Sequence, residues 1–257
     1  MFNIGDCVTR NSYSNDIIFK IIDIKEDIYY LKGVSVRLYA DSPKDDLLIC
    51  SNVSSDDFRP SIDEYRSLDR NEYFFLPGKV LHLDGDMEYL DKCMKFYKKN
   101  KVKAYGLYVK EDDMPSKVYE LLEKYNPEIL VLTGHDAYSR NKRNKYKNTS
   151  SFVDAVIESR KYEKAHDKLF VIAGACQSNY EDLIKAGANF ASSPKRINIH
   201  ALDPAIVASC ISFSNKNEDI DIIKILDKTK YGASGMGGII TKGSMYIGYP
   251  REWILGK

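Results

Sequence analysis

Hydrophobic residues follow two different patterns along the chain, and the change between them divides it into two parts. Up to residue 58, short apolar segments are separated by turn residues, which is typical of short strands. From residue 78 to residue 257, continuous apolar runs alternate with longer segments whose apolar residues recur every three or four positions. The polar and charged stretch between them, residues 59–77, has the composition of a linker.

The first part, residues 1–58, predicts a small β-barrel of the SH3 type. Turn signals such as Lys32-Gly33 and Ser42-Pro43 separate its apolar segments. The expected strands span residues 2–10, 17–24, 28–31, 34–39 and 47–50. Small barrels bind peptides, nucleic acid or a neighbouring domain, and the fold alone does not choose among these roles.

The second part, residues 78–257, predicts an α/β sandwich around a mostly parallel sheet. Apolar runs without polar alternation are typical of parallel strands covered on both faces, and helices between strands imply right-handed crossovers. The expected strands span residues 79–83, 104–109, 129–133, 169–173 and 190–192, with strand-like segments at 239–240 and 245–247. The expected helices span residues 88–99, 115–125, 151–161, 179–186, 203–211 and 219–226.

Two of these strands deliver a reactive side chain to their carboxyl ends. One apolar run ends at Gly134 and His135, and another ends at Gly174 and Cys176. Open parallel sheets place ligands just beyond the strand carboxyl ends, so the two side chains meet there if the strands are neighbours. A cysteine attacks as the thiolate, and a nearby imidazole takes its proton. The pair therefore predicts acyl transfer through a thioester, with Cys176 as nucleophile and His135 as base.

The same two turns are expected to supply the oxyanion hole. Its donors must lie about 3 Å from the developing negative charge. We expect the backbone amide of Cys176 and one amide from the turn Gly134 to Asp136 to occupy this position.

Other reactive residues support weaker hypotheses. His200 is a rival base, and His82 joins the site if its strand is adjacent. Ser178 lies outside a Gly-x-Ser-x-Gly elbow, so a serine hydrolase is a weak alternative. The glycine-rich residues 235–238 lack the pattern of a phosphate-binding loop, which favours an ordinary hairpin or crossing point. The histidines and cysteines have no zinc-ligand spacing, and we expect neither a metal nor another cofactor.

Composition and charge narrow the possible partners. The chain has 38 basic and 37 acidic residues, so its net charge gives no reason to expect nucleic acid or an anionic membrane as a partner. Its five cysteines are scattered without Cys-x-x-Cys pairs, which argues against a disulfide scaffold. No apolar run approaches the roughly 18 residues of a membrane span. We therefore expect a soluble, cytosolic protein.

Seven segments carry a resemblance to a known family. They span residues 5–10, 38–43, 79–86, 133–139, 173–178, 188–196 and 199–204. Through these segments the chain resembles the YabG family, the sporulation-specific peptidases of endospore-forming bacteria. The resemblance covers nearly the whole chain, and it is far more specific than a single Cys/His pair.

The resemblance implies a cysteine endopeptidase that processes spore coat and germination proteins late in sporulation. It also implies activity in the cytoplasm of the mother cell, association with the spore coat, and cleavage beside Arg. More distantly, the chain is similar to caspases, clostripain and gingipains, which implies a caspase-like or flavodoxin-like α/β sandwich. Those enzymes usually have His-Gly, whereas the order here is Gly134-His135-Asp136. This departure leaves open which amide of the turn completes the oxyanion hole.

A pocket for Arg needs a carboxylate that matches the fork of the guanidinium group. The candidates follow strand-end or turn signals near the expected cleft, and they are Asp84, Asp86, Asp136 and Asp203. Asp203 is the weakest candidate, because an Asp before Pro204 is more simply explained as a helix cap.

Two hypotheses concern the protein as a whole. The basic loop Ser139 to Thr149 offers Arg140 and Arg143 for self-cleavage, although a solvated loop explains its composition equally well. The alternative to an enzyme is a non-catalytic scaffold that assembles coat layers through the barrel. The sequence does not indicate the oligomeric state.

Overall fold

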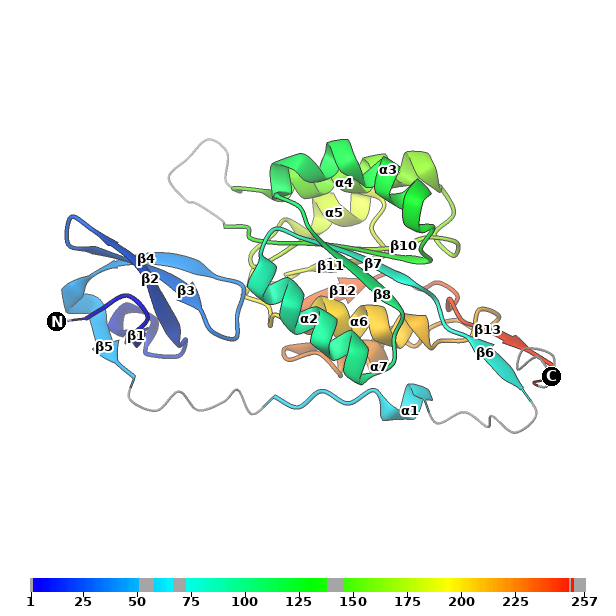
Figure 1. The fold of residues 1–257 in the computed structure, drawn as a ribbon, viewed down its shortest axis with the longest axis horizontal. Coiled ribbons are helices and arrows are strands. Elements are labelled where there is room, and N and C mark those ends of the chain that lie inside the picture. The colour runs from blue at the N-terminus through cyan, green and yellow to red at the C-terminus, as the bar shows by residue number, and fades with distance from the viewer. Residues whose placement is uncertain (1, 51–57, 67–72, 138–145, 250, 252–257) are drawn as a thin grey trace. The chain divides into compact units, whose positions relative to one another are not determined.

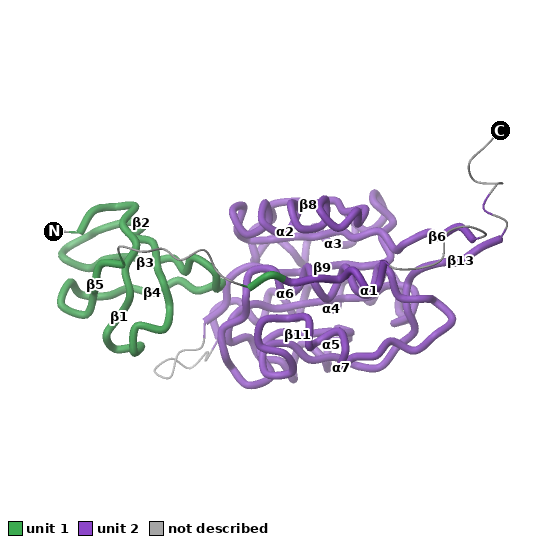
Figure 2. The backbone as a smooth tube through the Cα atoms, turned by 90° about the horizontal axis from the view of Figure 1, so that it is seen from below, with its two compact units in different colours: residues 1–59 green, residues 60–257 purple. Residues whose placement is uncertain are grey.

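The computed structural model describes residues 2–50, 58–66, 73–137, 146–249 and 251. The chain forms two compact units, Met1–Arg59 and Pro60–Lys257 (Figure 2). The separate linker expected at residues 59–77 stays a prediction. Arg140 and Arg143, the expected points of self-cleavage, lie outside the described residues.

The first unit is a five-stranded antiparallel sheet with the strand order β4-β3-β2-β1-β5. Its strands are β1 (Cys7–Arg10), β2 (Phe19–Lys25), β3 (Ile28–Gly33), β4 (Tyr39–Pro43) and β5 (Leu47–Ile49). Short 3-10 turns, η1 (Asn11–Tyr13) and η2 (Lys44–Asp46), connect some of them. Phe19, Ile21 and Leu31 are buried in its core at alternate strand positions, as the period of two requires.

The fourth strand of this unit corrects the sequence-based expectation. A strand was predicted over residues 34–39, but β4 begins only at Tyr39. Val36, Arg37 and Leu38 are all buried, so the segment does not alternate between a buried and an exposed face. The backbone turns there instead, because the amide of Leu38 donates to the carbonyl of Val36. The apolar residues of this segment therefore mark burial in the core and not a regular strand.

The second unit is an α/β sandwich with a mostly parallel sheet, which confirms the expected fold class. The six-stranded sheet has the order β12-β11-β10-β9-β7-β8, and only β12 runs antiparallel to its neighbour. Its strands are β7 (Val80–Asp84), β8 (Ala104–Tyr108), β9 (Ile129–Thr133), β10 (Phe170–Ala173), β11 (Phe190–Ser192) and β12 (Met236–Gly238). A separate two-stranded sheet pairs β6 (Phe74–Leu76) with β13 (Tyr246–Gly248). The caspase-like part of the expectation stays a prediction.

Helices cover both faces of this sheet (Figure 1). One face carries α3 (Met114–Tyr125), α4 (Thr149–Tyr162) and α5 (Tyr180–Ala186), and the other carries α2 (Met87–Lys99), α6 (Asp203–Ser212) and α7 (Ile222–Leu226). The short helix α1 (Asp63–Arg66) and the 3-10 turns η3 (Glu111–Asp113) and η4 (Gly232–Ser234) complete the unit. Because both faces are covered, all residues of β7, β9 and β10 are buried, which explains their continuous apolar runs. Among the described residues, no helix has the length and apolar character needed to cross a membrane.

The strand order reverses direction at β7. From β7 the chain adds β8 on one side, and it then crosses back to add β9, β10 and β11 on the other side. Open parallel sheets bind ligands at such a reversal, beyond the carboxyl ends of the strands. The edge formed by the ends of β7, β9 and β10 is therefore the place where a site is expected.

The glycine-rich segment near the C-terminus differs from its prediction. A strand was expected at residues 239–240, but β12 spans Met236–Gly238 and pairs with β11. A Cβ atom at Gly238 would lie 2.5 Å from the ring of Phe190, and one at Gly237 would lie 2.8 Å from the hydroxyl of Tyr180. These glycines let the edge strand approach its neighbours closely. Of the two predictions, a hairpin or a crossing point, the hairpin is wrong, because residues 236–238 form an edge strand.

Candidate active site

His135 and Cys176 belong to neighbouring turns at one edge of the sheet. β9 and β10 are parallel partners, with Leu132 opposite Ala173. His135 follows the end of β9, and Cys176 follows the end of β10. The hydroxyl of Ser178 donates to Oδ2 of Asp136 at 2.8 Å, so a hydrogen bond joins the two turns directly.

The Asp136 carboxylate holds this edge together. Its residue is only 3% exposed, and both oxygens accept hydrogen bonds from the protein. The donors are the amides of Ala137, Lys147 and Asn148 at 2.8 to 3.1 Å and the hydroxyls of Thr149 and Ser178. Thr149 opens α4, so the same carboxylate also fixes the beginning of that helix. The role of Asp136 in substrate binding stays a prediction.

Asp86 lies against the imidazole of His135. Its Oδ2 is 2.9 Å from Nε2 of His135, whose side chain is 12% exposed. Its Oδ1 accepts the amides of Glu88 and Tyr89 and thereby caps α2. A carboxylate on one ring nitrogen fixes the orientation of the imidazole and stabilises its charged form. The sequence marked Asp86 as a ligand for Arg, and its contact with His135 was missed.

A chain of buried hydrogen bonds lies behind Asp86. Oδ1 of Asp84 accepts the amide of Asp86 at 2.9 Å, and Oδ2 accepts the hydroxyl of Thr133 at 3.0 Å. Nε2 of His82 is 3.0 Å from the Thr133 hydroxyl, and its Nδ1 is 3.1 Å from the hydroxyl of Tyr97. Because Thr133 donates to Asp84, it accepts from Nε2 of His82, which leaves Nδ1 to accept from Tyr97. His82 therefore lies on a strand adjacent to β9, and Thr133 and Asp84 connect it by hydrogen bonds to Asp86.

The side chain of Cys176 is fully buried beneath the segment that contains Ile199. The amide of Ile199 donates to Sγ at 3.3 Å, and Sγ lies 3.7 Å from the carbonyl of Ile199. The amide of Gln177 donates to the carbonyl of Ile197 at 3.2 Å, which ties the same segment to the turn. In this conformation a substrate carbonyl cannot reach Sγ.

The backbone after Cys176 is strained. Gln177 has φ of +59°, a left-handed conformation that is uncommon for residues other than glycine. Such conformations cost free energy, and they are concentrated at functional sites where the surrounding structure holds them. This turn is therefore consistent with the reactive position expected for Cys176.

His200 and Asp203 lie on the segment that covers Cys176. Nδ1 of His200 accepts the amide of Leu202 at 3.1 Å. The Asp203 carboxylate accepts the amides of His200 and Lys230, each at 2.9 Å. Asp203 is not the N-cap of α6, as the sequence suggested. It is the first residue of the helix, and Leu202 occupies the N-cap position. His200 stays a rival base, since it directly follows Ile199.

The backbone of His135 is held on both sides. Its amide donates to Oε1 of Glu111 at 2.7 Å, and its carbonyl accepts from Nδ2 of Asn148 at 2.7 Å. The amide of His135 is thus already engaged, and Gly134 or Asp136 stays the predicted oxyanion donor of this turn. Nothing in the sequence pattern marked Glu111, because it lies in an ordinary acidic triplet after a strand.

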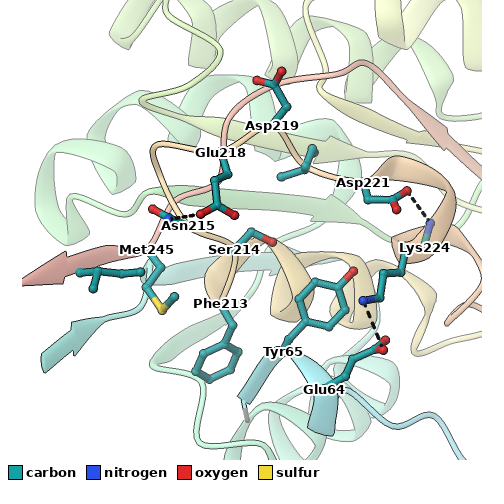
Figure 3. A pocket seen from close by; sticks show the side chains of 12 residues that line it. Glu64, Tyr65, Phe213, Ser214, Asn215, Glu218, Asp219, Asp221, Lys224 and Met245 are labelled. Carbon is teal, nitrogen blue, oxygen red and sulfur yellow. Dashed lines mark hydrogen bonds and ion pairs between the residues drawn. The ribbon is translucent and has the colours of Figure 1, made fainter. Parts of the chain in front are cut away.

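The pocket shown in Figure 3 is separate from this edge. It has a volume of about 280 Å³, and Phe213 and Ser214, which follow α6, line part of it. The amide of Gly78, just before β7, donates to the last residue of α6, so this region lies near the amino ends of the parallel strands. Glu64 in its lining is paired with Lys224. Among the described residues, no three His, Cys, Asp or Glu side chains form a group that could hold a metal ion.

Comparison with known families defines the class of the protein. The family described as YabG peptidase U57 matches residues 3–66 and 60–250. The protein is therefore a peptidase, a hydrolase of peptide bonds. It belongs to the YabG family, which confirms the resemblance found in the sequence.

One relative agrees with this assignment over nearly the full chain. The sporulation-specific protease YabG of Bacillus subtilis (strain 168) is 43% identical over 286 residues, which cover 98% of this chain and 99% of that protein. Among solved structures, a GDP-L-fucose synthetase from Naegleria fowleri is similar over 42% of this chain and 36% of that chain, at 15% identity and a TM-score of 0.22. This second similarity carries no functional argument.

We expect Asp136→Ala to lower the free energy of unfolding by about 3 kcal/mol, because the change leaves several buried donors without their acceptor. Asp154→Ala is the matched control, since Asp154 is exposed on α4. Urea unfolding followed by circular dichroism measures both. Equal stability of the two variants would show that Asp136 does not hold the edge together.

Proposed function

We propose that the protein is a cysteine endopeptidase in which Cys176 is the nucleophile and His135 is the base. One observation carries the proposal: the two turns that contain these residues are hydrogen-bonded neighbours at the carboxyl edge of the sheet. The carboxylate of Asp86 on the His135 ring supplies the third group of such a unit. Membership of a peptidase family supports the same reaction class.

The reaction follows from the roles of these groups. Because Nε2 of His135 donates to Asp86, Nδ1 takes the proton from the Cys176 thiol. The thiolate attacks the scissile carbonyl, and the amide of Cys176 with that of Gly134 or Asp136 stabilises the oxyanion. His135 returns the proton to the departing amine, which leaves a thioester on Cys176. Water then hydrolyses the thioester, with His135 again as base.

Substrate binding in this proposal requires a movement of the segment that covers Cys176. Ile199 occupies the position beside Sγ through both of its backbone groups. A peptide substrate offers the same kinds of backbone groups, so it can replace these contacts when the segment withdraws. The described conformation is then the resting state of the enzyme.

The biological setting is proposed from the relative. The Bacillus subtilis protein is named a sporulation-specific protease, and its similarity extends over nearly the full length of both chains. We propose that this protein likewise acts during sporulation, in the cytoplasm of the mother cell. Its proposed substrates are spore coat and germination proteins, and it is proposed to associate with the spore coat.

Removing either member of the Cys/His pair should abolish cleavage. We expect Cys176→Ala and His135→Ala each to lower kcat/KM on the order of 10³-fold or more, because such residues act as a unit. Cys210→Ala is the control, since burial raises the pKa of that thiol to about 12 and keeps it neutral. Hydrolysis of fluorogenic arginyl peptides provides the measurement.

Three outcomes contradict parts of this assignment. Wild-type cleavage by Cys176→Ala would exclude Cys176 as nucleophile. Loss of cleavage in His200→Ala together with activity in His135→Ala would transfer the role of base to His200. A wild-type protein without any peptidase activity would favour the coat scaffold.

Asp86 should matter through its charge on His135. Asp86→Asn keeps an oxygen that can cap α2, but it removes the carboxylate that stabilises the charged imidazole. We expect kcat to fall by on the order of 10²-fold or more with the melting temperature nearly unchanged. Asp91→Asn is the control, because Asp91 lies exposed on the same helix and pairs with Lys95. An unchanged kcat in Asp86→Asn would remove Asp86 from the catalytic unit.

We propose a preference for a basic side chain before the scissile bond. The candidate carboxylates for this pocket are Asp84, Asp86, Asp136 and Asp203. All four already accept internal hydrogen bonds, and Asp136 accepts five, so a guanidinium group bound by any of them has to share the carboxylate with these donors or replace one of them.

Peptide profiling tests this preference. We expect arginyl and lysyl peptides to be cleaved on the order of 10²-fold faster than peptides with a neutral residue at that position, since a paired charge-assisted hydrogen bond provides discrimination of this size. The alanine variant of the true ligand loses this ratio, which is measured within each variant and is therefore independent of any change in its overall rate. An unchanged ratio in all four variants would eliminate this set.

A further inference from the structure

Glu111 contacts the candidate active site from a turn that lies two strands away in the sheet. It is the first residue of η3, which follows β8, and β7 lies between β8 and β9. Its partly buried side chain nevertheless extends to the turn after β9, where Oε1 accepts the amide of His135 at 2.7 Å. The side chain therefore connects three successive strand ends.

Two glycines make room for this carboxylate. A Cβ atom at Gly85, after β7, would lie 2.2 Å from Oε1 of Glu111, and one at Gly134 would lie 2.3 Å from the same oxygen. At both positions the three nearest atoms all belong to Glu111. Neither glycine has a positive φ, so backbone conformation does not require glycine there. A side chain at either position would displace the carboxylate of Glu111 from its present place.

The contact fixes the backbone that carries the base. The amide of His135 is held by Glu111, its carbonyl by Asn148, and its ring by Asp86. A hydrogen bond from an amide to a carboxylate is about twice as strong as one to a neutral acceptor. With both peptide groups next to His135 held, the imidazole and the following amide of Asp136 keep a fixed direction.

We propose that Glu111 is a positioning residue for His135, seated between the turns of Gly85 and Gly134. The proposal rests on the proposed role of His135 as base. Glu111 does not touch the reacting atoms, so its loss should lower the rate of the chemical step and leave substrate binding unchanged. A misplaced base of this kind costs on the order of 10²-fold in rate.

Three variants of the full-length protein test the proposal in the peptide assay. We expect Glu111→Ala to lower kcat by on the order of 10²-fold, with KM within about threefold of wild type. Glu111→Gln keeps an oxygen acceptor at the same place and should recover most of the rate. Asp113→Ala is the matched control, because Asp113 lies in the same 3-10 turn with a side chain that is 51% exposed.

A double-mutant cycle tests the seating of the carboxylate without relying on catalysis. Gly85→Ala should lower the melting temperature in the wild-type background, because its methyl group collides with Glu111. In the Glu111→Ala background the same change should cost much less, since the space is vacated. Equal effects of Gly85→Ala in both backgrounds would overturn the seating of Glu111.

The kinetic outcomes separate this proposal from the proposed function. Activity that survives Cys176→Ala would refute the cysteine mechanism, while the stability cycle would still report on Glu111. Activity that depends on Cys176 and His135 but is unchanged in Glu111→Ala would overturn the positioning role alone. A loss of arginyl preference in Glu111→Gln, with neutral peptides cleaved normally, would also overturn it and assign Glu111 to substrate binding.

Discussion

The buried carboxylate of Asp136 is the interaction on which the candidate active site depends. A charge that is removed from water is stable only where polar partners replace its hydration. Here those partners come from its own turn, from the start of α4 and from Ser178 in the turn of Cys176. The hydrogen bonds that this one carboxylate accepts thus hold together segments that are distant in the sequence. Because these segments carry His135 and Cys176, the same hydrogen bonds determine how the two turns lie relative to each other.

Support for His135 comes from successive strands of the sheet. The turn after β7 supplies Asp86 to the ring, and the turn after β8 supplies Glu111 to the backbone amide. Behind Asp86, the hydrogen-bond chain through Asp84, Thr133 and His82 lies in the fully covered part of the sheet. A rigid scaffold therefore holds loop residues in place, which is how α/β proteins commonly combine stability with a reactive edge.

The thiols of Cys210 and Cys176 differ in what surrounds them. Cys210 is a buried residue of α6, and burial raises the pKa of its thiol. It has the properties of a packing residue. Cys176 is also buried, but its cover consists of a loop whose backbone contacts Sγ. A loop held by a few hydrogen bonds moves at a lower free-energy cost than a helix in a core. Burial by itself therefore does not distinguish an inert cysteine from a nucleophile at rest.

The sequence by itself determined the alternation of strands and helices, the fold class and the positions of His135 and Cys176 at two strand ends. These features follow from local periodicity. A continuous apolar run indicates a strand that is covered on both faces, whichever strands lie beside it. Tertiary structure alone decided that Asp86 contacts the ring of His135, that Glu111 accepts the amide of His135 and that Ile199 covers the thiol of Cys176. Each of these contacts joins residues far apart in the chain, and each depends on the order of strands in the sheet. Local patterns report which residues are buried, whereas partners across strands are set by the path of the whole chain.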